Sequence, residues 1–134
     1  MAISVRILSQ SNRVYLSVTD NFRFLDFFGA WREILQNPDF QPNHTMVWDL
    51  SKIDASSLLD SDLRRIAEFM QGQIRVSGFT TSVALIAPTK AIYGLANSYL
   101  TFLLEDQNNF SIFRTLASGE AWLQSRQNQQ EASD

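Results

Sequence analysis

The stretch from Met46 to Leu59, MVWDLSKIDASSLL, decides the fold of this 134-residue chain. Met46, Val47 and Trp48 are apolar at successive positions, so the strand that they form has to be buried on both faces. Central strands of parallel sheets that are covered by helices have this character. An aspartate and a polar turn follow, and they lead into a helix. The stretch therefore predicts a layered α/β domain, although it carries no catalytic or metal-binding signature.

Length and composition limit the class of protein. A chain of 134 residues fits one domain with one core. It contains no cysteine, which excludes disulfides, thiolate catalysis and cysteine metal sites. A net charge of -3 with scattered basic residues disfavours binding to nucleic acid. No apolar run approaches the roughly 20 residues of a membrane span and no signal segment opens the chain, so we expect a cytoplasmic protein.

Two strands and a helix are predicted before the central strand. Alternating apolar positions predict half-buried strands that form a hairpin across residues 9–12. The next segment has an apolar stripe about 120° wide, which predicts a helix packed on the sheet. The apolar positions are Ile3, Val5 and Ile7, then Val14, Leu16 and Val18, and in the helix Phe24, Phe27, Phe28, Trp31, Ile34 and Leu35.

After the central strand, the pattern alternates between helices and strands. A helix containing Leu63, Ile66, Ala67 and Met70 precedes a second continuous apolar strand at 83–87, and this pair of buried strands predicts a right-handed βαβ unit. A helix over about 89–104, a strand at 110–113 and a helix from 116 to about 126 complete the order β-β-α-β-α-β-α-β-α.

The predicted class is therefore α/β, with a mixed, mostly parallel sheet of about five strands and about four helices packed against it. Residues 1–126 are expected to form a single domain. Residues 127–134 lack large apolar side chains and are expected to be a disordered polar tail.

Three segments resemble the SpoIIAA-like proteins of the STAS superfamily of anti-sigma-factor antagonists. They are VWDLS at 47–51, SVALIAP with AIYGLANSYL at 82–100, and FSIFRTLASGEAWL at 110–123. A strand ending in Asp, a helix starting with Tyr-Gly-Leu-Ala, and a final Phe-Arg plus Ala-Trp-Leu element recur in this order in that group. The resemblance covers the chain apart from its tail. It implies a mostly parallel sheet covered by helices, in bacterial cytoplasmic proteins that mostly lack an assigned activity.

The resemblance also implies a candidate modification site. In the best understood members of the superfamily, a partner kinase phosphorylates a serine in an Asp-Ser-Ser-Gly-Leu loop. The counterpart here is DASSL at 54–58, which places the acceptor at Ser56 and a switch loop or partner contact at Asp49, Asp54, Ser57 and Asp60. The pattern is incomplete, because its first serine is an alanine and its glycine is Ser57. A helix start favours a phosphate, but turn-forming and capping roles account for these serines without one, and we favour that interpretation.

No residues in the sequence combine into an active site. His44 is the only histidine and lies in a predicted turn, which favours a structural role. Asp49, with Asp54 and Asp60 nearby, offers carboxylates for Mg²⁺ or for acid-base chemistry, but aspartates after strands are also ordinary turn residues, and we favour that interpretation. The five glycines are not grouped into a phosphate-binding loop. We therefore expect a protein that is not an enzyme and uses no metal or cofactor.

The helix over about 89–104 is apolar over about 200°, which is wider than one sheet contact needs. Tyr93, Leu100 and Leu104 flank its buried face and are candidate interface or ligand-facing residues, while Gly94 and Ser98 on the opposite side would let another backbone approach. A homodimer is the simplest explanation. We therefore expect a regulatory protein-protein interaction module. The alternatives are a carrier or sensor of a lipid-like or other apolar small molecule, and a phospho-switch at Ser56.

Overall fold

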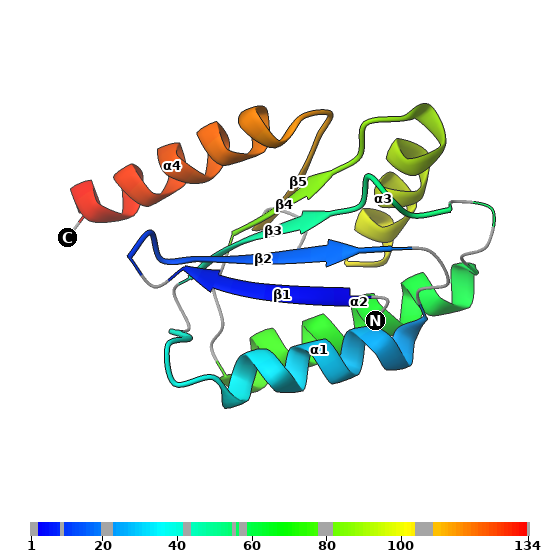
Figure 1. The fold of residues 1–134 in the computed structure, drawn as a ribbon, viewed down its shortest axis with the longest axis horizontal. Helices are drawn as coiled ribbons and strands as arrows, with labels where there is room; N and C mark the ends of the chain where they lie inside the picture. Colours follow the sequence, from blue (N-terminus) through cyan, green and yellow to red (C-terminus); the bar gives the residue numbers. More distant parts are fainter. Residues whose placement is uncertain are drawn as a thin grey trace.

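The computed structural model describes residues 3–8, 10–19, 23–41, 44–54, 56, 59–77, 82–103 and 109–133. In these residues five strands form one sheet in the order β1-β2-β3-β4-β5, with four helices packed against it (Figure 1). The strands are β1 (Ile3–Leu8), β2 (Arg13–Val18), β3 (Thr45–Asp49), β4 (Val83–Ile86) and β5 (Phe110–Phe113). The helices are α1 (Phe24–Gln36), α2 (Asp60–Ser77), α3 (Lys90–Phe102) and α4 (Leu116–Ser133).

This architecture confirms the predicted α/β class and the mostly parallel sheet. β1 pairs with β2 in the antiparallel sense, and every later pairing from β2 to β5 is parallel. The strands are added to the sheet in one direction, so right-handed crossovers put their connecting helices on one face. Figure 1 shows α1, α2 and α3 on that face and α4 alone on the other. None of the helices in the described segments is long and apolar enough to cross a membrane.

Burial of β3 on both faces confirms the prediction from its continuous apolar run. Met46, Val47 and Trp48 are all buried, and β3 lies between β2 and β4 in the sheet. Met46 and Trp48 belong to the large core under α1, α2 and α3, whereas Val47 belongs to a smaller core under α4. The central strand therefore joins two separate apolar layers.

The buried stripe of α1 is narrower than predicted. Phe27, Ala30, Trp31 and Ile34 are buried, but Phe28 and Leu35 are exposed. The buried stripe is narrow because α1 packs against β1, at the edge of the sheet, and against α2. Only the inner side of the helix therefore contacts the core. The structure consequently leaves an apolar outer side on this helix.

The C-terminal helix also differs from the prediction. α4 continues beyond Arg126 to Ser133 instead of giving way to a polar tail at 127–134. Gln127 is bonded to the body of the protein, since its Oε1 accepts from Arg13 Nη2 at 3.3 Å and its Nε2 donates to the Ser11 carbonyl at 3.4 Å. The segment is rich in Gln, Glu and Ala, which are good helix formers. Polarity alone therefore did not identify an unstructured segment.

Gly119 sets the distance between α4 and the sheet. A Cβ atom at this position would lie 2.7 Å from Ile86 Cδ1 and 3.3 Å from Ala84 Cβ. A side chain here would have to displace the end of the Ile86 side chain and would press on Ala84 Cβ. The smaller core under α4 therefore depends on a residue without a side chain.

We expect Gly119→Val to lower the free energy of unfolding by about 1–3 kcal/mol, because the added methyl groups overpack the contact with β4. Gly72→Ala is the matched control: its Cβ would have no neighbour within 4 Å, and alanine should raise stability by up to about 1 kcal/mol through helix propensity. Urea denaturation of the two variants measures both changes. Equal stability of Gly119→Val and the wild type would show that α4 is not closely packed at this position.

Candidate functional site

A small cavity lies in the large core, at the carboxyl ends of the parallel strands. Its volume is about 40 Å³, and we call it the core cavity. The sheet, the loop after β3 and all three helices of that face contribute to its lining: Leu16, Val18, Phe27, Trp48, Leu50, Ile53, Leu63, Ile66, Leu85, Leu95, Ala96 and Tyr99. Open α/β sheets bind their ligands outside the carboxyl ends of the strands, and the core cavity lies at this end of the sheet.

Two polar atoms of residues near the core cavity are buried in the large core without a partner, although neither atom is exposed to the cavity itself. The Trp48 indole nitrogen and the Tyr99 hydroxyl are buried, and neither forms a hydrogen bond within the described part of the chain. Their rings lie 5.8 Å apart. Burial raises the pKa of Tyr99 well above its usual value, so the phenol keeps its proton and remains a donor. Each unpaired buried donor costs about 1–3 kcal/mol of folding free energy.

A surface groove adjoins the core cavity. It has a volume of about 370 Å³ and runs between α3 and the segment that leads into α2; we call it the α3 groove. Its lining consists of Ser56, Asp60, Leu63, Ala91, Gly94, Leu95 and Ser98. The structure thus brings the predicted residues Ser56 and Asp60 together with the small residues of α3. Leu63 and Leu95 line both the groove and the cavity.

Ser56 is held by an aspartate and does not cap a helix. The Asp54 carboxylate accepts hydrogen bonds from the Ser56 hydroxyl at 2.7 Å and from the Ser56 backbone N–H at 3.0 Å. Both hydrogen bonds lower the pKa of the Asp54 carboxyl, and the bond from the Ser56 hydroxyl makes the larger contribution. α2 begins only at Asp60 and already carries Asp60 and Asp62 in its first turn. A phosphate on Ser56 would therefore meet nearby carboxylates, and Ser57 lies outside the described residues.

The predicted aspartates do not form one site. Asp49 lines a second groove, of about 320 Å³, on the sheet face that carries α4, together with Arg6 and Tyr15. Its Oδ1 accepts from the Ser51 backbone N–H at 3.0 Å, as expected for a turn residue. Asp60 instead lines the α3 groove on the opposite face. Among the described residues, no group of three or more acidic or histidine side chains could hold a metal ion.

His44 is buried inside a turn. Its Nδ1 accepts a hydrogen bond from the Gln41 backbone N–H at 2.7 Å, and its ring stacks on Phe40 with a centroid separation of 5.5 Å. These contacts close the turn before β3. They agree with the structural role that the sequence favoured for this residue.

The wide apolar face of α3 is mostly used inside the fold. Ile92, Ala96 and Tyr99 are buried, and Leu100 is half-buried against the large core. Tyr93 is 37% exposed, and the Arg114 guanidinium lies over its ring at 4.9 Å. Leu104 lies outside the described residues.

Exposed apolar side chains gather on α1, where the sequence analysis did not look for them. Leu25 is 73% exposed, Leu35 50% and Phe28 37%. The signal was present as the spacing of these residues, because Leu25, Phe28 and Leu35 lie on one side of a 3.6-residue helix. It was hidden because Phe28 and Leu35 also fitted the edge of the predicted buried stripe.

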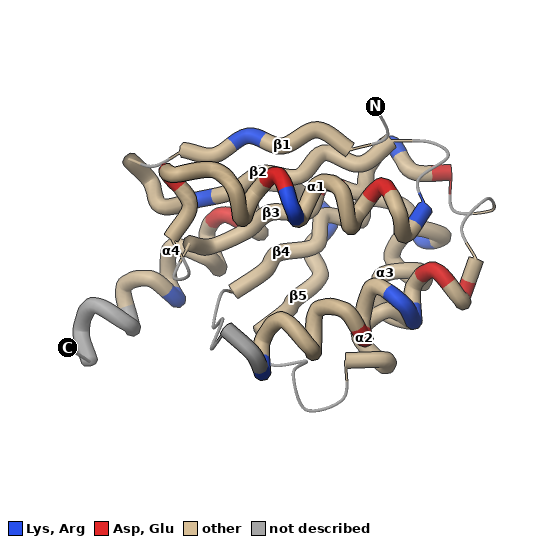
Figure 2. Tube along the Cα trace, turned by 90° about the horizontal axis from the view of Figure 1, so that it is seen from below, with Lys and Arg blue, Asp and Glu red and all other residues tan. Residues whose placement is uncertain are grey.

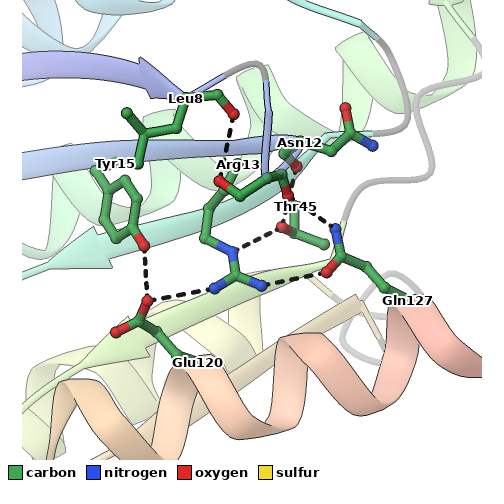
Figure 3. Close-up of polar contacts among 8 residues, drawn as sticks. Leu8, Asn12, Arg13, Tyr15, Thr45, Glu120 and Gln127 are labelled. Carbon is green, nitrogen blue, oxygen red and sulfur yellow. Dashed lines mark hydrogen bonds and ion pairs between the residues drawn. The ribbon is translucent and has the colours of Figure 1, made fainter.

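A second feature missed by the sequence analysis is the polar cluster that holds α4 on the sheet (Figure 3). Arg13 is buried at the start of β2, and its Nη1 lies 3.3 Å from Glu120 Oε2 of α4. Arg13 Nε also donates to Thr45 Oγ1 at 3.1 Å, and the Tyr15 hydroxyl donates to the same Glu120 oxygen at 2.7 Å. We call this cluster, with Gln127, the α4 clamp. Its members pair with one another, which is the arrangement of a structural contact.

Comparison with known proteins does not add to this geometry. No protein-family model matches the chain, and no curated protein is significantly similar to it. The resemblance to SpoIIAA-like proteins therefore rests on the three sequence segments described above.

Replacing Ser56 with alanine should raise the pKa of Asp54 toward its ordinary value, because the variant loses the hydroxyl donor that contributes most to the lowering. The measurement is a titration of the Asp54 side-chain carboxyl carbon by NMR in both proteins. Ser56→Thr retains a hydroxyl and serves as the control. An unchanged Asp54 titration in Ser56→Ala would show that the Ser56 hydroxyl does not bond to this carboxylate in solution.

Tyr99 should make the protein less stable at alkaline pH. The pKa of Tyr99 is higher in the folded state than in the unfolded state. Its contribution to the free energy of unfolding is therefore complete below the unfolded pKa of about 10, and it is lost as pH rises toward the folded pKa. Between these values the unfolded state has released a proton that the folded state keeps, which costs up to about 1.4 kcal/mol per pH unit. Chemical denaturation between pH 8 and 11 should show that the free energy of unfolding falls less steeply with pH in Tyr99→Phe than in the wild type. Equal slopes for the two proteins would contradict the burial of this phenol.

Proposed function

We propose that the protein is a non-catalytic, STAS-like regulatory module that works through protein-protein contact, and that it forms a homodimer through α1. The observation that carries this proposal is the uncovered apolar side of α1, with Leu25 73% and Leu35 50% exposed. Apolar side chains gathered on one exposed helix face mark a partner surface more often than scattered single residues do.

The spacing on α1 fits a second copy of the same helix. Leu25, Phe28, Arg32 and Leu35 follow the three-four-three spacing of a coiled-coil seam. This spacing reads the same in both directions, so a two-fold axis beside the middle of α1 would put Leu25 against Leu35 of the second copy. The same axis would put Phe28 against Arg32, a pairing that favours a cation-π contact.

The charges on α1 also suit self-association. Figure 2 looks onto the face of α1, α2 and α3, and it shows acidic and basic residues mixed along α1. A helix with both signs can approach an antiparallel copy without like charges facing each other along its whole length. In α1 the acidic residue of the first turn is Asp26, and Arg32 follows in the second half of the helix.

The absence of catalysis is supported by the placement of the candidate groups. His44 is buried in a turn, and Asp49 and Asp60 line grooves on opposite faces of the sheet. An active site needs a positioned base and a reacting group within hydrogen-bond reach of one another. These three residues are not arranged in that way.

Leu25→Asp should convert the dimer to a monomer. The change occurs twice in a symmetric interface, and a loss of about 1.4 kcal/mol at each position weakens the dimer about 100-fold. Light scattering coupled to size-exclusion chromatography measures the mass of both proteins across a concentration series. Leu116→Asp is the matched control, because Leu116 is 43% exposed but begins α4 on the other side of the sheet. A wild-type monomer at high micromolar concentration, or a dimer unaffected by Leu25→Asp, would refute the proposed interface.

A further inference from the structure

The core cavity can hold only apolar atoms. Its volume of about 40 Å³ exceeds the roughly 10–15 Å³ that one water molecule needs, but the cavity exposes no polar atom to an occupant. A buried water needs several hydrogen-bond partners, so it would find none there. The cavity therefore fits a short alkyl segment, which would gain van der Waals contacts with the apolar walls.

The α3 groove lies directly outside this cavity. Leu63 and Leu95 line both spaces, so these two side chains separate the interior from the surface. Leu95 is half-buried, and a change of its rotamer is the smallest movement that would join the two spaces. On the outer side, a Cβ atom at Gly94 would have no neighbour within 4 Å, so the groove is open beside Leu95. A molecule in the groove can therefore place an apolar end in the cavity.

The polar side chains of the groove present hydrogen-bond acceptors. The Ser56 hydroxyl already donates to the Asp54 carboxylate at 2.7 Å. The Ser98 hydroxyl donates to the Gly94 carbonyl at 3.1 Å. A hydroxyl carries one proton, so both oxygens are left with lone pairs, and the carboxylate of Asp60 can only accept. The polar head of an occupant therefore has to be a donor.

The charge of the groove also selects the head group. Asp60 lines the groove, and the described lining residues include no Lys, Arg or His. A primary ammonium has three donors and no acceptor, so it matches a wall of acceptors that carries a negative charge. A carboxylate or phosphate head would instead meet the like charge of Asp60. The groove, at about 370 Å³, falls in the size range of small-molecule sites.

We propose that the α3 groove and the core cavity together bind a short primary alkylamine in its ammonium form. The ammonium lies beside Asp60, and the alkyl chain passes Leu95 into the cavity. None of the exposed apolar residues of α1 lines either space, so amine binding is separate from dimer formation. The Leu25→Asp variant should therefore bind the amine as the wild type does, whatever its oligomeric state.

The test titrates three probes with six carbon atoms, hexylamine, hexan-1-ol and hexanoate, into the methyl-labelled full chain at pH 7. The readouts are the Leu95 methyl resonances and the Ile66 δ-methyl resonance, each assigned by its loss in Leu95→Met or Ile66→Val. Ile66 lines the cavity but not the groove, so it reports entry of the chain. We expect hexylamine to shift both in a saturable manner and to bind at least tenfold more tightly than the other two probes. Methylamine, which has no chain, should leave Ile66 unmoved.

Two pairs of variants test the head group and the route of entry. Asp60→Asn removes the counter-charge and should weaken hexylamine at least fivefold, while Glu68→Gln removes a charge from an exposed position of the same helix outside the groove and should have no effect. Gly94→Leu fills the groove and should abolish the shift of Ile66. Gly72→Leu makes the same change at an open position of α2 and should leave the shift intact.

The proposal is overturned if saturating hexylamine leaves the Ile66 resonance unmoved, because the chain then does not enter the cavity. It is also overturned if hexan-1-ol or hexanoate binds as tightly as hexylamine, or if Asp60→Asn binds the amine as the wild type does. Shifts that never saturate would mean nonspecific association and would overturn it as well. The comparison of the probes in the wild type decides the question even where a variant does not fold.

Discussion

The handedness of the strand connections is the constraint on which the rest of this structure depends. β2, β3, β4 and β5 are added in sequence order and in one direction, so right-handed crossovers place α1, α2 and α3 on the same face. That face acquires a thick apolar core and the cavity at the strand ends. The opposite face receives no crossover helix, and α4, which follows β5, covers it.

The packing of α4 shows how the chain meets this requirement with few contacts. Leu123 and Trp122 provide the apolar contact, Gly119 allows a close approach to β4, and the α4 clamp fixes the position along the sheet. The ion pair of Arg13 and Glu120 contributes little net stability, because Arg13 is desolvated while the Glu120 side chain is 37% exposed and therefore screened by water. Its effect is to define where α4 lies, since a displaced helix would leave Arg13 without its carboxylate.

The sequence predicted the layers well because they follow from local patterns. The continuous apolar run at Met46–Trp48 and the helical spacing of Leu63, Ile66, Ala67 and Met70 are readable within a few residues, and both were confirmed. The α4 clamp could not be read in this way, because its partners are 107 residues apart. The unpaired donors on Trp48 and Tyr99 are a property of three-dimensional packing, since either residue, read alone, is an ordinary core aromatic.

The late position of α4 has a consequence for the protein during its synthesis. Every strand is complete by Phe113, but Glu120 and Leu123 leave the ribosome only afterwards. Until α4 packs, Val47, Ala84 and Ile86 lack the cover that Leu123 and Trp122 provide in the folded chain. Such a surface on a nascent chain is a site for aggregation or for chaperone binding. The packing of α4 therefore ends the period in which this part of the growing chain is most exposed to misassembly.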